Sequence, residues 1–284
     1  MPVEHDPAAI ESRAGVDKPD PILVIDGLYK TFGGLVAVDV ERLQVEAGWI
    51  TALIGPNGAG KTTLFNLLTG FDRPGRGRFS FMGRDLTGQG PHRIARAGMV
   101  RTFQLTKSLS KMSVMDNMLL AGADQRGERF GPNLVRRSWR AQERALEERA
   151  VELLERFRLV DMRAEYAGTL SGGQRKLLEM ARALMVRPQL ILLDEPMAGV
   201  NPALVESLLG HVHALKEGGM SVLFVEHDMD VVMGISDWVV CMAEGLVIAE
   251  GPPSAVVADP MVRAAYLGTR ADAPMAATRS ADPR

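Results

Sequence analysis

Short, almost uninterrupted apolar runs recur along the chain, and several end in glycine or in acidic residues. Runs of this kind are typical of strands buried in a parallel sheet. Helical patterns follow the last two runs, and another helical pattern, TTLFNLLTG, occupies 62–70. We therefore predict an α/β fold with a mainly parallel sheet, whose candidate strands are WITALIG (49–55), LILLDEP (190–196) and MSVLFVEHD (220–228). ILVIDGL (22–28) predicts a further strand.

Two segments alternate between apolar and polar positions, as hairpins do. GRFSFMGRDL (77–86) predicts an edge hairpin in an antiparallel β subdomain, and CMAEGLVIAEG (241–251) predicts a terminal hairpin. Between about 90 and 175 the pattern is mostly helical and richer in charge. There, one apolar stripe predicts an inserted α-helical subdomain, and it consists of Leu146, Ala150, Leu153, Leu154 and Phe157.

The two ends of the chain are rich in proline, alanine and charge, with little periodicity. We predict disordered tails at 1–20 and 269–284, which leaves residues 21–268 as the folded domain. The 46% apolar and 24% charged residues are ordinary for a soluble globular protein. A net charge of −2 indicates no nucleic-acid partner.

Composition also limits where the protein works. The single cysteine, Cys241, excludes an internal disulfide and fits a reducing compartment. No segment approaches the about 18–20 apolar residues of a membrane helix, and the acidic start of the chain does not resemble a signal peptide. We expect a cytoplasmic protein that reaches a membrane only through a partner.

The stretch GPNGAGKTT (55–63) matches the pattern G-x-x-x-x-G-K-[ST] between a predicted strand and a predicted helix. Glycines let backbone N–H groups surround phosphates, the Lys61 ammonium reaches the outer phosphates, and the Thr62 hydroxyl ligates Mg²⁺. We predict an ATP site made by Gly55, Pro56, Asn57, Gly58, Ala59, Gly60, Lys61, Thr62 and Thr63.

Acidic residues follow the buried run LILLDEP. Asp194 is predicted to hold Mg²⁺, and Glu195 is predicted to polarise a water toward the γ-phosphate. His227 ends the next apolar run, at the edge of the sheet where ligands bind. A lone histidine is more often structural, but this position favours contact with the phosphate.

A second glycine-rich helix start, LSGGQ, places Ser171, Gly172, Gly173 and Gln174 before a helical pattern. Helix N-termini bind anions. In the alternative interpretation, Ser171 only caps the helix. One triphosphate cannot use both starts within one subunit if the two lobes lie apart. We therefore predict a head-to-tail dimer, in which the Ser171 turn of one subunit closes over the ATP of the other.

The motifs LSGGQ, GPNGAGKTT, LILLDEP and VEHD together resemble the nucleotide-binding subunits of ATP-binding-cassette (ABC) transporters, over about 22–268. The resemblance implies that Phe32 stacks on adenine. It also implies that Gln104, in RTFQ, touches Mg²⁺ and water and joins the helical lobe to the core. The family usually has SALD where this chain has AGVN (198–201), so Asn201 puts the usual hydrogen bonds of this loop in doubt.

Further phrases resemble the LivG-type ATPases of branched-chain amino-acid importers: RTFQ, MSVMDNMLLA, DEPMAGVNP and DPMVRAAYLG. This implies ATP hydrolysis that powers uptake through separate transmembrane permease subunits docked near Gln104 and 105–120. The other implied partners are a second ATPase subunit, identical or paralogous, and indirectly a periplasmic or extracellular substrate-binding protein. Urea-importer and lipopolysaccharide-export ATPases stay as alternatives. A DNA-repair ATPase is disfavoured because Lys61 and Ser171 lie too close for a long coiled coil.

Overall fold

The computed structural model describes residues 5–102, 109–122 and 136–271 and contains a six-stranded and a four-stranded sheet. The larger sheet has the order β10-β9-β3-β8-β7-β6. All neighbouring strands in it are parallel except β9 and β10, which form the predicted terminal hairpin. Its strands are β3 (Ile50–Ile54), β6 (Met99–Arg101), β7 (Leu190–Asp194), β8 (Ser221–Val225), β9 (Trp238–Ala243) and β10 (Leu246–Gly251). Every residue of β3 and β8 is buried, which explains their uninterrupted apolar sequences.

The four-stranded sheet is antiparallel, with the order β2-β1-β4-β5. It contains β1 (Pro21–Phe32), β2 (Leu35–Glu46), β4 (Arg76–Phe81) and β5 (Arg84–Asp85). The β4–β5 pair at its edge confirms the hairpin predicted at 77–86. Most of β2 was not predicted from apolar runs, because buried and exposed positions mix in its first half.

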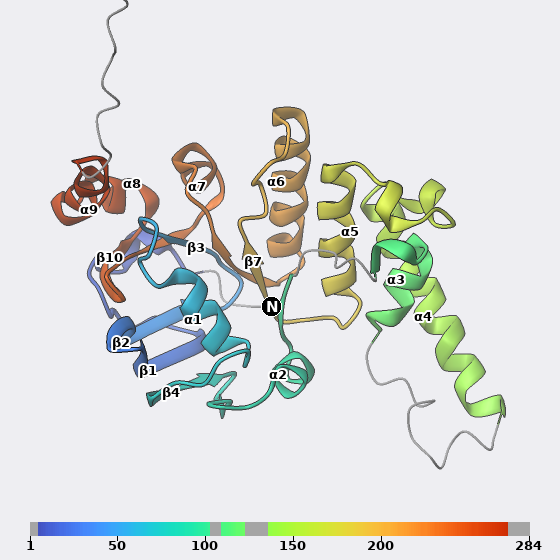
Figure 1. Ribbon diagram of the computed structural model, residues 1–284, viewed down its shortest axis with the longest axis horizontal. Helices are drawn as coiled ribbons and strands as arrows, with labels where there is room; N and C mark the ends of the chain where they lie inside the picture. The colour runs from blue at the N-terminus through green and yellow to red at the C-terminus, as the bar shows by residue number, and fades with distance from the viewer. Residues whose placement is uncertain (1–4, 103–108, 123–135, 272–284) are drawn as a thin grey trace, which may run out of the picture.

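Helices cover the larger sheet and extend away from it. Figure 1 shows α3 and α4 at one end of the molecule, with α5 between them and the sheet, and the four-stranded sheet toward the other end. The helices are α1 (Lys61–Leu68), α2 (Pro91–Ala97), α3 (Val114–Leu120), α4 (Arg136–Arg156), α5 (Gly172–Leu184), α6 (Pro202–Glu217), α7 (Met229–Ile235), α8 (Pro253–Ala258) and α9 (Pro260–Ala271). Short 3₁₀ helices are η1 (Pro7–Ala9), η2 (Leu109–Lys111), η5 (Val160–Met162) and η6 (Ala167–Thr169). Among the described residues, no helix is long and apolar enough to cross a membrane.

The predicted apolar stripe of α4 is confirmed, because its last four members are buried and Leu146 packs against the same core. The predicted boundary of the helical part, about 90–175, is wrong. Strand β6 pairs in parallel with β7 and therefore belongs to the larger sheet. A strand as short as Met99–Arg101 carries no periodicity that distinguishes it from its helical neighbours. Helix α5 also continues past 175, to Leu184.

The prediction of a disordered N-terminal tail is wrong for residues 5–20. Lys18 Nζ lies 2.8 Å from Glu250 Oε2, with both side chains buried. The same carboxylate accepts hydrogen bonds from Trp238 Nε1 and from the backbone N–H of Gly15. These contacts leave no periodic pattern, because single charged groups and backbone atoms make them. At the other end, α9 extends to Ala271, beyond the predicted boundary at 268, and the rest of the predicted C-terminal tail lies outside the described residues.

Candidate functional site

The loop between β3 and α1 requires its glycines. Gly55 has φ +145°, and a Cβ atom there would lie 2.1 Å from the backbone oxygen of Met242. Gly60 has φ +100°, and its Cβ would lie 2.2 Å from the backbone oxygen of Ala37. Gly58 also has a positive φ, but a Cβ there would meet open space. The backbone can therefore adopt this tight turn only with glycine at 55 and 60, and the turn leads directly into α1.

Helix α1 begins without a side-chain cap, since Gly60 occupies the N-cap position. Uncapped N–H groups at a helix start bind anions such as phosphate. The Lys61 ammonium lies over the same loop and donates to the backbone oxygens of Gly55 (2.6 Å) and Pro56 (2.9 Å). Burial lowers the pKa of Lys61, against the opposing influence of Glu195. The start of α1 thus combines free backbone donors with a nearby amine.

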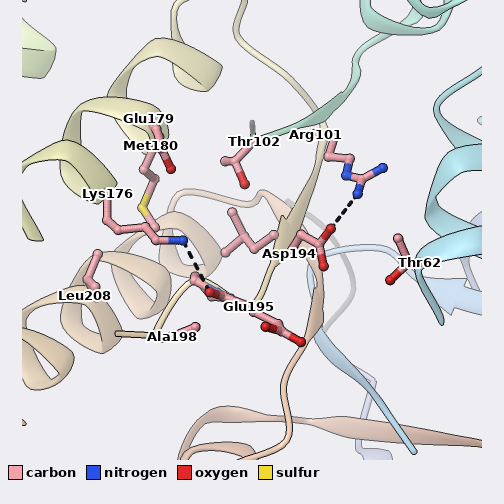
Figure 2. Close-up of a pocket in the computed structure, with 12 residues that line it drawn as sticks. Thr62, Arg101, Thr102, Lys176, Glu179, Met180, Asp194, Glu195, Ala198 and Leu208 are labelled. Atoms are coloured by element: carbon pink, nitrogen blue, oxygen red, sulfur yellow. Dashed lines mark hydrogen bonds and ion pairs between the residues drawn. The ribbon is translucent and has the colours of Figure 1, made fainter. Parts of the chain in front are cut away.

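A cavity of about 440 Å³ brings together Thr62 of α1 with Asp194 and Glu195 at the end of β7. Figure 2 shows the Thr62 and Asp194 side chains facing each other across it. Hydroxyl and carboxylate oxygens are the ligands that Mg²⁺ prefers. The chemistry of these residues therefore suits a magnesium ion beside the glycine-rich turn, and metal binding by Thr62 and Asp194 stays a prediction.

Glu195 has an unusual backbone conformation, because its φ is +45° although it is not glycine. Its N–H donates to the Val225 oxygen of β8 (3.1 Å), and its own carbonyl accepts from Lys176 Nζ of α5 (3.4 Å). Non-glycine residues in this region are strained and cluster at functional sites. The strand end thus holds an exposed Glu195 carboxylate at the cavity.

His227, which is predicted to contact the phosphate, follows strand β8. Its side chain is exposed, and its Nδ1 lies 3.3 Å from Oε1 of the buried Glu226. Among the described residues, His227 does not line the cavity that Asp194 and Glu195 share. Contact between His227 and a phosphate therefore stays a prediction.

The LSGGQ turn starts α5 with a complete capping box. The Gln174 N–H donates to Ser171 Oγ (3.3 Å), and the Ser171 N–H donates to the Gln174 side-chain oxygen (2.9 Å). Ser171 therefore caps a helix within the subunit, as the alternative interpretation held. The cap does not exclude a second role, because a hydroxyl can also donate to a ligand.

The two glycines of this turn differ. Gly173 is buried, and a Cβ there would lie 1.5 Å from Leu204 Cδ2 of α6. Gly172 is exposed and lines a cavity of about 280 Å³ with Ala198, Gly199 and Val200. Asn201, the residue that departs from the family's usual aspartate, accepts from the Leu204 N–H and caps α6. Within one subunit, this second turn lines a different cavity from Thr62.

Two predicted residues remain. Phe32 ends β1 with 51% of its surface exposed, and Lys30 Nζ lies 4.9 Å from its ring centroid. An exposed ring at a strand end is available for stacking on a base. Gln104 lies outside the described residues.

Arg101, the first residue of the RTFQ motif, is a further residue of the site that no sequence pattern predicted. Arg101 ends β6 and forms an ion pair with Asp194, with Nη2 2.5 Å from Oδ2 (Figure 2). Recognising β6 as a strand would have placed Arg101 at the same sheet edge as Asp194. Lys176 and Glu179 of α5 also line the cavity.

Most of this chain is similar in sequence to known proteins. Residues 39–198 match the family described as ABC transporter, and residues 247–272 match the one described as branched-chain amino acid ATP-binding cassette transporter. The probable branched-chain amino acid transport ATP-binding protein LivG of Archaeoglobus fulgidus is 44% identical over 249 residues, which cover 88% of this chain and 96% of that protein. The high-affinity branched-chain amino acid transport ATP-binding protein BraF of Pseudomonas aeruginosa is 42% identical and covers 87% of this chain and 98% of its own.

Solved structures agree with these sequence matches. A nucleotide-free ATP-binding cassette from an ABC transporter superposes with a TM-score of 0.77 at 39% identity, covering 87% of this chain and 98% of that one. The ADP conformation of such a cassette gives the same TM-score at 38% identity, covering 87% and 99%. The chain therefore belongs to the ABC transporter family, as one of its ATP-hydrolysing ATP-binding subunits.

Proposed function

We propose that this subunit hydrolyses ATP with Mg²⁺ to power the uptake of branched-chain amino acids through separate permease subunits. The observation that carries the proposal is the cavity in which Thr62, Asp194 and Glu195 meet beside the uncapped start of α1. The choice of substrate rests on the 44% and 42% identity to branched-chain amino acid transport proteins. The separate C-terminal match over 247–272 supports the same choice.

Each residue of the site has a distinct proposed role. Residues 55–63 bind the phosphates, with Lys61 at the outer ones, and Phe32 stacks on adenine. Thr62 and Asp194 hold the metal together with Gln104. Bound there, Mg²⁺ would neutralise charge on the phosphates. Glu195 orients or deprotonates the attacking water, and His227 steadies the γ-phosphate.

A closed head-to-tail pair of subunits completes the proposed mechanism. Gly172 is exposed and unhindered, so its N–H and the Ser171 hydroxyl can approach a phosphate of a second subunit. The second subunit is a copy of this chain or a paralogue. ATP favours the closed pair because it contacts both subunits there, and a ligand shifts an equilibrium only through such differential binding.

The permease subunits dock, in this proposal, on the groove between α2 and α5. Two cavities of about 240 Å³ and 210 Å³ share Ala95, Val100 and Arg101 there, and Phe71 is exposed beside the first. A helix with an apolar face fits such a groove. The methionines of 105–120 are less available to a permease helix than the residues of this groove, since Met118 is fully buried and Met115 packs against the core. A substrate-binding protein would act indirectly, through the permease.

The test is leucine uptake by the subunit reconstituted in vesicles with its permease and substrate-binding protein. We expect Glu195→Gln to bind ATP normally but to hydrolyse it about 10²–10⁴-fold more slowly and to abolish uptake. It should accumulate as an ATP-bound dimer, seen by light scattering. The exposed Glu217→Gln on α6 is the matched control and should keep full uptake. Normal ATP turnover by Glu195→Gln would refute its role, and ATP-driven uptake of urea instead of leucine would refute the substrate.

A further inference from the structure

Arg101 lies between three elements that meet at the nucleotide cavity. It is the last residue of β6. Its Nη2 is 2.5 Å from Asp194 Oδ2 of β7, and its Nη1 donates to Asn66 Oδ1 of α1 at 2.7 Å. Its guanidinium carbon lies 5.6 Å from the centroid of the Phe65 ring. The side chain is thus held on several sides and cannot simply swing into solvent.

The arginine is much more buried than the carboxylate that it contacts. Only 9% of the Arg101 side chain is exposed, against 28% for Asp194. Asp194 therefore keeps surface open toward the cavity, where Thr62 faces it. One carboxylate thus serves two neighbours: the guanidinium of Arg101, which lines the same cavity, and the open space of that cavity toward Thr62.

We propose that Arg101 is a built-in counter-ion of Asp194 that limits how tightly the site binds its metal ion. This inference rests on the proposed magnesium site at Asp194. A positive charge beside a carboxylate repels a second cation that approaches the same oxygens. Asp194 therefore binds a metal ion less tightly than it would without Arg101.

Arg101 has an opposing effect on metal binding as well. Arg101 also holds the carboxylate in one orientation, which favours metal binding by reducing the entropy lost. Holding one short side chain contributes about a few-fold in affinity. A unit charge within hydrogen-bonding distance changes the affinity of a carboxylate for a cation by about tenfold or more. The repulsion therefore exceeds the benefit of orientation.

The position of Arg101 gives this weakening a consequence. Thr102 continues the pairing of β6 with β7 through its N–H to Leu192 (3.0 Å), and Gln104 follows two residues later in the chain. When Asp194 also binds a metal ion, the ion pair between Arg101 and Asp194 of β7 weakens. Metal occupancy at Asp194 is therefore linked, in this proposal, to the contact that joins the ends of β6 and β7.

Calorimetry of ADP binding, with EDTA and then with Mg²⁺, tests this proposal without requiring turnover. The measured quantity is the dissociation constant of ADP in EDTA divided by its dissociation constant in Mg²⁺. This ratio reports how much the metal ion increases the affinity for ADP. Arg101→Gln should raise this ratio about tenfold over the unmodified subunit. Arg101→Met, which keeps a long unbranched side chain without the charge, should do the same and serves if the first variant folds poorly. Arg101→Lys keeps the charge but not the fork that also reaches Asn66, and its ratio should lie closer to the original than that of Arg101→Gln.

Two further variants show whether the magnesium site itself or only the role of Arg101 is wrong. Asn66→Ala removes the neutral partner of Arg101 but no charge, so its ratio should stay within about twofold of the original. Asp194→Asn should bring the ratio close to one. A normal ratio in Asp194→Asn would overturn the magnesium site and this inference together. A low ratio in Asp194→Asn, with no rise in Arg101→Gln and Arg101→Met, would overturn the role of Arg101 alone.

Discussion

The two glycine-rich helix starts, at α1 and at α5, differ in how their first backbone N–H groups are satisfied. Gly60 leaves α1 without a side-chain cap, so its first N–H groups are available to an anion within the same subunit. The start of α5 is already satisfied by the Ser171–Gln174 capping box. The first start is therefore incomplete without a ligand. The second is stable alone and can offer its exposed turn to another subunit.

The glycines of the two helix starts are required for different physical reasons. Gly55 and Gly60 have left-handed φ angles and lie against backbone oxygens. Gly172 and Gly173 are helical, and their glycine identity depends on space: Gly173 lies against Leu204, while Gly172 faces outward. A glycine-rich motif in a sequence thus marks either a required backbone shape or a required absence of a side chain. The structure distinguishes the two.

The largest expected difference concerns nucleotide affinity. Lys61→Ala should weaken ATP binding by the isolated subunit about 100-fold, since it removes a charge-assisted contact worth about 2.7 kcal/mol. The matched variant on the second helix, Arg175→Ala, removes a cation of α5 that does not line the cavity at Thr62, and it should change this affinity less than about twofold. Calorimetry at concentrations that keep the subunit monomeric measures both. Equal losses would mean that α1 and α5 bind nucleotide together within one subunit.

A smaller effect is expected on stability within the first turn. Gly60→Ala should lower the free energy of unfolding by about 2–4 kcal/mol, because it combines left-handed strain with a collision with the Ala37 oxygen. Gly58→Ala meets open space and should cost only about 1 kcal/mol. Chemical denaturation compares the two variants. A cost at Gly58 as large as that at Gly60 would show that strain alone, and not the close approach, requires glycine.

The smallest expected effects separate the two roles of the second turn. Ser171→Ala should lose about 1 kcal/mol of stability with the cap, whereas Gly172→Ala should gain about 0.5 kcal/mol, since alanine favours the helix. Both should weaken ATP-driven dimerisation in a Glu195→Gln background, measured by light scattering. If Gly172→Ala dimerises normally, the turn is a helix cap and nothing more.

Local signals in the sequence were sufficient for much of the fold. The apolar runs of β3, β7 and β8 are fully or almost fully buried as predicted, because a strand covered on both faces needs apolar residues at every position. The stripe of α4 was equally clear, since burial of one helix face imposes a period of about 3.6 residues. The turn at 55–60 was found because its shape demands glycine at fixed positions.

The elements that were missed depend on neighbours instead. Strand β6 is only three residues long, so its pairing with β7 has no pattern of its own. Residues 5–20 are held by contacts such as Lys18 with Glu250, which are 232 positions apart. The N-terminal segment reads as a polar tail unless its buried partners are known.

The sequence by itself determined the chemical groups and the local shapes of this protein: a glycine-rich turn before a helix, a strand that ends in Asp194 and Glu195, and a helix that starts after Ser171. Only the tertiary structure decided which groups share a cavity. It joined Arg101 to Asp194 across 93 positions and kept the Ser171 turn out of the cavity at Thr62. The physical reason is that helices and glycine turns follow from neighbouring residues. A contact between distant residues depends on how whole elements pack, and it leaves no periodic trace in the chain.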